Sequence, residues 1–283
     1  MFIAFSNVDA LAGVVCRFFA PLKVVYVSTD YSPKRRFENP VLNAIYSVAD
    51  RWAYRWADVV WHMYVERGEL KKYKHRARSY DVLDGNNFRR IERFPVDKIN
   101  PFRLVYIGQI NRDCRLEEAI NAVANLKGKF PNVGIDIIST GDPELERRLQ
   151  ALAKDRGMAD QIIFHGQIRS SEVYEEIIKR CGLGLCLYEI DKDDFAWFGT
   201  PLKVYLYAAC GVPSICSNAM GPQTMDYMEK GGVGLLAARG TLEQTLQSIF
   251  SDPARYAQMR ERTIKWAAQF DYDDKFDKFL ALV

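Results

Sequence analysis

A lysine stands at the predicted positive end of a short helix, where a cation is disfavoured. In residues 200–217, "TPLKVYLYAACGVPSICS", Thr200 suits a helix N-cap and Pro201 suits the first helical position. Lys203 is then the third residue of the helix, at a cost of about 0.3–1 kcal/mol. Because helix amides and the helix dipole attract anions, a phosphate would turn Lys203 into a ligand. The alternative interpretation is that the amine reaches into water.

Two arginines could supply a second cation for the same anion. Arg112 and Arg115 come soon after "RLVYIG", residues 103–108, which is typical of a buried strand. A diphosphate would engage both the lysine and an arginine. Neither GxGxxG nor GxxxxGK[ST] follows this strand, so the sequence excludes the usual dinucleotide fingerprint and the P-loop.

Strands and helices alternate from residue 103 to residue 250. The predicted strands are 103–108, 133–140, 161–166, 183–189, 212–217 and 233–238. The predicted helices are 115–130, 143–157, 170–181, the helix that contains Lys203, 222–230 and 241–250. Strands that alternate with helices of about 10–15 residues are typical of βαβ units. The sequence therefore predicts an α/β fold with a parallel, doubly wound sheet.

Four loops follow the predicted strands, at the sheet edge where doubly wound sheets bind ligands. They are residues 108–112, 140–143, 166–169 and 188–200. Gly108, Gly141 and Gly166 lie in the first three, and glycine permits a close backbone approach and a positive φ. Ordinary turn chemistry explains each of these glycines equally well.

The first 80 residues show a fainter alternation. "MFIAFS", "LKVVYVST" and "DVVWHMYV" (58–65) are predicted strands, and residues 39–57 a long helix. The polar, turn-rich segment 81–101 is typical of a link between domains. We therefore predict two domains, residues 1–95 and 96–283, in line with about 150 residues per domain.

Composition excludes several classes of protein. With 48% hydrophobic and 27% charged residues, the chain is typical of a soluble globular protein. None of the six cysteines forms a CxxC pair and the three histidines lack ligand spacing, so we predict no metal site and free, mostly buried thiols. No stretch reaches the roughly 18 apolar residues of a membrane-spanning helix, and no basic region precedes the apolar N-terminus as in a signal peptide.

The positive charge is concentrated in the first part of the chain. Residues 1–100 carry 17 Lys and Arg against 11 Asp and Glu, and "RGELKKYKHRAR" (67–78) is a basic run. A solvated helix face explains this run most simply. A second hypothesis is attraction to anionic lipid head groups, worth about 1 kcal/mol per basic residue. Nucleic acid is a weaker third option, because no nucleic-acid-binding module is visible.

Several motifs together resemble a known family. "YIGQIN", "STGDPE", "IIFHGQI" and "PLKVYLYAACGVPSICSN" occur in the order and spacing of the donor-binding half of group 1 glycosyltransferases, the retaining family 4 class. "VVYVSTDYSP" and "ADRWAYRWADVVW" resemble the later part of the acceptor domain of that family. The resemblance implies the GT-B fold, in which two Rossmann-like domains face a cleft. The chain resembles a member that starts within the first domain, so we expect an N-terminal truncation.

The resemblance also implies roles for particular residues. It gives Arg112 or Arg115 the role of the family arginine and Lys203 or Arg115 that of its lysine, both at the donor diphosphate. Asp30, at the end of a predicted strand, is a candidate acceptor contact or base, with a simple Asx turn as the alternative. The donor-binding positions that the resemblance implies are Gly108, Gln109, Gly141, Gly166, Gln167, Ile168 and Leu206.

The chain departs from the family pattern at two acidic positions. The family carries two glutamates, the second of which usually binds ribose; Phe198 and Leu206 stand at these positions. Leucine offers the ribose hydroxyls no hydrogen-bond acceptor in its side chain. This departure motivates two alternatives to an active transferase: a non-catalytic module that binds a nucleotide or a protein, and a nucleotide-sugar epimerase of the same fold.

The resemblance implies a hexosyltransferase. It would move a sugar from a nucleotide-diphosphate sugar to a saccharide or lipid-linked acceptor during envelope or exopolysaccharide synthesis. We expect no cofactor and no metal, because lysine and arginine can stabilise the leaving diphosphate. We expect no nucleic-acid partner, and we expect a cytoplasmic protein, peripheral on the inner face of the membrane.

Overall fold

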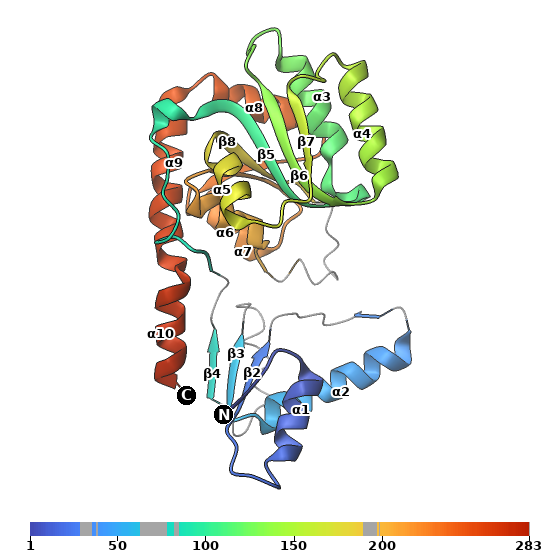
Figure 1. Ribbon diagram of the computed structural model, residues 1–283, viewed down its shortest axis with the longest axis vertical. Helices are drawn as coiled ribbons and strands as arrows, with labels where there is room; N and C mark the ends of the chain where they lie inside the picture. The colour runs from blue at the N-terminus through green and yellow to red at the C-terminus, as the bar shows by residue number, and fades with distance from the viewer. Residues whose placement is uncertain are drawn as a thin grey trace.

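The protein contains two parallel β-sheets, each in its own α/β unit (Figure 1). The computed structural model describes residues 1–28, 36–37, 39–62, 78–81, 85–188, 197 and 199–282. The predicted domain boundary at residues 95 and 96 falls between the last strand of the first sheet and the first strand of the second. The α/β prediction with parallel sheets is confirmed.

The first sheet has four parallel strands in the order β1-β2-β3-β4. They are β1 (Phe2–Ala4), β2 (Val24–Ser28), β3 (Val59–His62) and β4 (Arg78–Asp81). Helices α1 (Asn7–Cys16) and α2 (Pro40–Trp56) pack against each other, and the cluster of Ala10, Ala53 and Tyr54 covers one face of the strands. The structure contains the predicted strands and helix of this part, although Thr29 of the second predicted strand and residues 63–65 of the third lie outside the described residues.

The second sheet has six parallel strands in the order β10-β9-β8-β5-β6-β7. The strands are β5 (Asn100–Ile110), β6 (Gly134–Gly141), β7 (Ile162–Gly166), β8 (Cys181–Cys186), β9 (Ser214–Ser217) and β10 (Gly234–Ala237). The α-helices are α3 (Leu116–Leu126), α4 (Pro143–Asp155), α5 (Ser171–Lys179), α6 (Leu202–Ala209), α7 (Pro222–Glu229), α8 (Leu242–Phe250), α9 (Pro253–Ala267) and α10 (Tyr272–Leu282). Short 3-10 turns are η2 (Val96–Lys98), η3 (Arg112–Cys114) and η5 (Ala268–Phe270). The order reverses between β5 and β8, which is the switch point where such sheets bind ligands.

The second sheet is covered on both faces, as a parallel sheet requires. One cluster includes Ile120, Ile135 and Leu149 and contains side chains of α3, α4 and α8. Clusters on the opposite face contain side chains of α5, α6, α7 and α9. All six cysteines are free thiols; five are buried, as predicted, but Cys16 is exposed at the end of α1.

Helices α9 and α10 join the two units. Figure 1 shows them along one side, from the second sheet to the first. In α9, Trp266 stacks on Tyr205 of α6 with the ring centroids 5.3 Å apart. In α10, Phe279 stacks on Trp61 of β3 at 4.8 Å and packs with Val25 on the face of the first sheet opposite α1. The C-terminal helix therefore belongs to the core of the first unit.

We predict that Phe279→Ala destabilises the first unit by about 3–5 kcal/mol, because it removes a buried aromatic ring and leaves a cavity. Phe279 is 5% exposed, whereas Phe276 of the same helix is 59% exposed, so Phe276→Ala is a matched control. Urea denaturation followed by tryptophan fluorescence measures both variants. Equal, small effects of the two substitutions would contradict this packing of α10.

Candidate functional site

The amine of Lys203 lies at the carboxyl end of the second sheet, beside Gly108 of β5. Its Nζ is shielded from solvent and has no hydrogen-bond partner among the described residues. A Cβ atom built on Gly108 would lie 2.8 Å from this Nζ, so only glycine leaves room for the amine there. Gly108 also has a φ of 142°, which side chains rarely adopt.

Two tyrosine rings form the walls around this ammonium. The Nζ lies 4.2 Å from the ring centroid of Tyr106 and 4.7 Å from that of Tyr188, within the range of cation–π attraction. The Tyr106 hydroxyl donates to the carbonyl of Gln109 at 2.6 Å, which fixes the backbone next to Gly108. Ring faces stabilise a cation less than a hydrogen-bonded anion does, so the charge is only partly compensated.

Burial lowers the pKa of the Lys203 ammonium from its ordinary value of 10.5 to about 8. The thiols of Cys186, Cys114 and Cys216 raise this pKa and oppose the burial effect only in part. The ammonium form of Lys203 is therefore incompletely stabilised, and an anion bound at this position would stabilise it.

The position of Lys203 is fixed by the residue one turn further along α6. The Tyr207 hydroxyl accepts from the amide of Ile107 at 2.9 Å and donates to the carbonyl of Leu185 at 3.3 Å. These bonds tie α6 to β5 and β8 on either side of the switch point. Gly184 of β8 makes this approach possible, because a Cβ there would collide with the Tyr207 ring.

The start of α6 differs from the sequence prediction. The helix begins at Leu202, so Pro201 is the N-cap residue rather than the first helical residue, and Lys203 is the second residue rather than the third. The Thr200 hydroxyl accepts from Thr224 of α7 at 3.1 Å instead of capping the helix. The N-cap side chain makes no hydrogen bond to the first amides of α6, and the third of these amides, of Val204, donates to the carbonyl of Pro201 at 2.9 Å. Helix amides without a side-chain cap favour an anion at the helix start.

The structure gives the two predicted arginines different surroundings. Arg112 lies exposed in η3, directly after β5. Arg115 is buried and donates to the Glu118 carboxylate at 2.9 Å and to the carbonyl of Ala238 at 2.9 Å. Glu118 neutralises the charge of Arg115. Arg115 is therefore better placed to hold the start of α3 against the end of β10 than to bind a diphosphate. Arg112 remains the candidate second cation.

The other predicted donor-binding residues surround the same sheet edge with unequal roles. Gln109 pairs with Thr140 in the β5–β6 ladder, so β5 continues beyond the predicted strand. Gly141 has a φ of 145°, and a Cβ there would collide with the backbone of Ile110; its role is close packing of two strands. Gly166 has a φ of 64° at the end of β7 with open space at its Cβ position, as expected of a turn.

The remaining predicted residues are placed as follows. Gln167 is exposed after β7, and Ile168 is partly buried against an apolar cluster that includes Ile178 of α5 and Tyr207 of α6. Leu206 packs against the same apolar cluster, so the position offers no polar group. Asp30 and Phe198 lie outside the described residues. The sequence prediction missed Tyr106 of β5 and Tyr188, two residues after β8, because both stand among apolar residues and are typical of a core.

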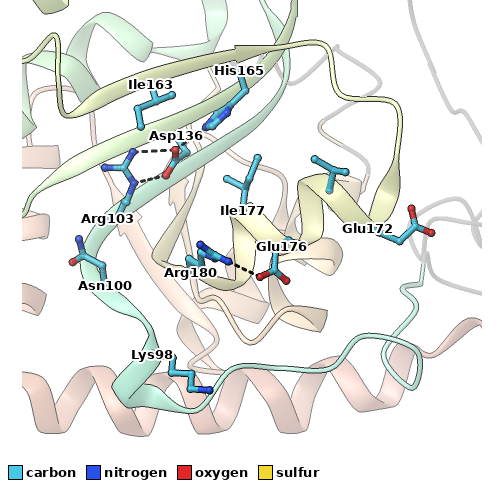
Figure 2. A pocket seen from close by; sticks show the side chains of 11 residues that line it. Lys98, Asn100, Arg103, Asp136, Ile163, His165, Glu172, Glu176, Ile177 and Arg180 are labelled. Atoms are coloured by element: carbon cyan, nitrogen blue, oxygen red, sulfur yellow. Dashed lines mark hydrogen bonds and ion pairs between the residues drawn. The ribbon is translucent and has the colours of Figure 1, made fainter.

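A pocket of about 730 Å³ lies on the α5 face of the second sheet, toward the amino ends of β5 and β6 (Figure 2). At its base the Asp136 carboxylate accepts from Arg103 and from the Nε2 of His165, the latter at 2.7 Å. Burial raises the pKa of Asp136, but the hydrogen bonds from Arg103 and His165 outweigh it and the net shift is downward. His165 thus helps to satisfy the hydrogen-bonding capacity of a buried carboxylate, which is a structural role.

Comparisons with solved structures define the class of fold. Anabaena HepE in complex with UDP has a TM-score of 0.71 at 17% identity, covering 99% of this chain and 78% of HepE. Sucrose-phosphate synthase from Thermosynechococcus elongatus has a TM-score of 0.67 at 16% identity, covering 99% of this chain and 74% of that one. The pneumococcal O-GlcNAc transferase GtfA in complex with UDP and GlcNAc has a TM-score of 0.60 at 17% identity, covering 92% and 52%. The fold is therefore GT-B, as predicted.

The family follows from a sequence model. The model described as "Glycosyl transferases group 1" matches residues 88–266, which is more than half of the chain. The chain belongs to the group 1 glycosyl transferases, and the resemblance noted in the sequence is confirmed. A sequence search of curated proteins gives no match.

We predict that Lys203→Met stabilises the unliganded protein by on the order of 2 kcal/mol at neutral pH, because it removes a buried charge whose pKa is depressed. Between about pH 8 and 10.5 the unfolded chain still holds the lysine proton while the folded chain has released it. The unfolded state then binds more protons than the folded state. The destabilisation that the buried ammonium causes therefore decreases as the pH rises through that window.

Urea denaturation of both proteins at neutral and alkaline pH measures the effect. The advantage of Lys203→Met over the wild type should shrink toward pH 10.5. A variant that is less stable than the wild type at neutral pH would contradict the picture of an uncompensated ammonium.

Proposed function

We propose that the chain binds the diphosphate of a nucleotide sugar between Gly108 and the start of α6. The observation that carries the proposal is the buried Lys203 amine, which has no hydrogen-bond partner in the part of the chain that the structure describes and lies against a glycine at the switch point. The helix end without a side-chain cap adds amide donors and a favourable dipole for the same anion. The solved complexes of HepE with UDP-glucose and of GtfA with UDP are consistent with this ligand class.

The proposed reaction is transfer of the donor sugar to a saccharide or lipid-linked hydroxyl. The bond between the anomeric carbon and the phosphate oxygen breaks, and a bond between that carbon and the acceptor oxygen forms. The leaving diphosphate gains negative charge as its bond breaks, so Lys203 and Arg112 would stabilise the transition state more than the ground state. Cations of the chain can play this part, which supports the expectation that no metal and no cofactor is required.

A second candidate is a module that binds nucleotide without turnover. The observation that favours it is Leu206, which packs in an apolar cluster at the position of an expected acid. Release of UDP from UDP-sugars, with and without added acceptors, separates the candidates. Turnover that is lost in Lys203→Ala supports a transferase, binding without turnover supports the second candidate, and an altered sugar without acceptor supports an epimerase.

We also propose that the protein acts at the inner membrane surface in envelope or exopolysaccharide synthesis. The support is the predominance of Lys and Arg in residues 1–100, since anionic head groups attract such segments. Residues 67–77 of the basic run lie outside the described residues. Within the described part of the chain, no helix is long and apolar enough to cross a bilayer.

We predict that UDP binds the wild-type protein and that Lys203→Ala weakens its affinity roughly ten- to hundredfold, the effect of losing one charge-assisted hydrogen bond. Lys230→Ala is the control, because Lys230 is exposed on the far end of α7 and pairs with Asp226 at 2.9 Å. Isothermal titration calorimetry measures all three proteins. If UDP does not bind, or if both variants bind it as the wild type does, the proposed site is wrong.

The affinity for UDP should fall as the pH rises above about 8. The unliganded lysine loses its proton near that pH, and only the ammonium pairs with the diphosphate, so each further pH unit should cost roughly tenfold in affinity. Binding at pH 8 should take up protons, which calorimetry detects as a dependence on the ionisation enthalpy of the buffer. An affinity that stays constant to about pH 10 would argue against Lys203 as the ligand.

A further inference from the structure

Helix α2 presents a row of large apolar side chains to solvent. Val41, Ile45, Val48 and Trp52 are 64%, 59%, 55% and 57% exposed. Their spacing of four, three and four residues places them on one stripe of the helix. Figure 1 shows α1 and α2 at one side of the first sheet, with α2 extending outward. The four side chains of this stripe are therefore open to solvent on the first unit.

A shallow apolar groove of about 430 Å³ runs along this stripe. Its lining consists of Leu11 from α1 together with Ala44, Ile45, Val48, Ala49 and Trp52 from α2. The two alanines form low points between larger side chains. Such alternation of small and large apolar side chains suits the interdigitation of another helix.

The stripe is complementary to itself in the reversed direction. If a second α2 lies antiparallel with a two-fold axis at the middle of the stripe, Val41 meets Trp52 and Ile45 meets Val48. The small residues also match, since Ala44 meets Ala49. We infer that this face binds a second copy of the chain through an antiparallel pair of α2 helices, a two-fold contact in which the same surface serves both partners.

Charge distinguishes the two helix orientations at the C-terminal end of α2, where Arg51 and Arg55 are exposed. In a parallel pair each of these arginines would lie beside the same arginine of the other copy, which the antiparallel pair avoids. Arg36 adds a cation near the N-terminal half of the helix, 5.5 Å from the ring centroid of Tyr46. A flat lipid surface is a poorer match, because the apolar side chains line a groove.

The exposed area suits a weak dimer. A 17-residue helix is about 25 Å long, and stable interfaces bury about 800 Å² on each partner. Four large side chains that are more than half exposed, together with Leu42 at 47%, supply a substantial part of such an area. Dimerisation in the micromolar range is expected.

Sedimentation velocity across the micromolar range tests the inference. The wild type should form dimers, and either Val48→Glu or Ile45→Lys should weaken dimerisation roughly tenfold or more. A mixture of these two variants should form dimers again, because antiparallel pairing places the introduced ammonium of one copy opposite the introduced carboxylate of the other. In a parallel pair each of these positions would face the same position of the partner, and the mixture would not recover.

Val173→Glu is the control for an added charge, because Val173 is 51% exposed on α5, far along the chain from this face. Circular dichroism checks that every variant remains folded. A wild type that stays monomeric throughout overturns the inference. So does dimerisation that survives both single substitutions, or vesicle binding by a monomer that Val48→Glu abolishes, which would make the face a membrane surface.

Discussion

The structure depends on one costly arrangement: a lysine ammonium buried at the switch point of a parallel sheet, with no hydrogen-bonding anion among the described residues. Burial lowers its pKa to about 8, and the rings of Tyr106 and Tyr188 offset only part of the cost. The sheet nevertheless holds the lysine in place, because Tyr207 anchors α6 to both neighbouring strands. The unliganded protein is less stable because it keeps this charge buried, and binding of an anion to Lys203 would restore that stability.

Several residues around Lys203 make room for the buried amine and hold it in place. Gly108 removes a side chain that would meet the amine, Gly184 admits the Tyr207 ring, and Tyr106 fixes the backbone at Gln109. Arg115 donates its hydrogen bonds to Glu118 and to the carbonyl of Ala238 after β10, so its charge is already compensated. The sheet edge also carries the first amides of α6, which have no side-chain cap, and the exposed Arg112. Together with Lys203 these are the groups that we propose bind a diphosphate.

Much of this fold could be predicted from the sequence, because the alternation of strands and helices after residue 103 is strong. The six strands and Lys203 near a helix start follow from local patterns alone. The details depend on distant partners: Thr200 bonds Thr224 instead of capping α6, and Arg115 is held by the carbonyl of Ala238 at the end of β10. The apolar stripe of α2 has the periodicity of a core-facing helix, and only the structure shows that it faces solvent.

The most direct test is the side-chain NMR titration of Lys203, assigned by the loss of its signal in Lys203→Met. Without ligand its pKa should be near 8, and with saturating UDP it should rise, because the diphosphate stabilises the ammonium. A pKa at the ordinary lysine value, unchanged by UDP, would contradict the account, since the amine would then be neither buried nor a ligand of the nucleotide.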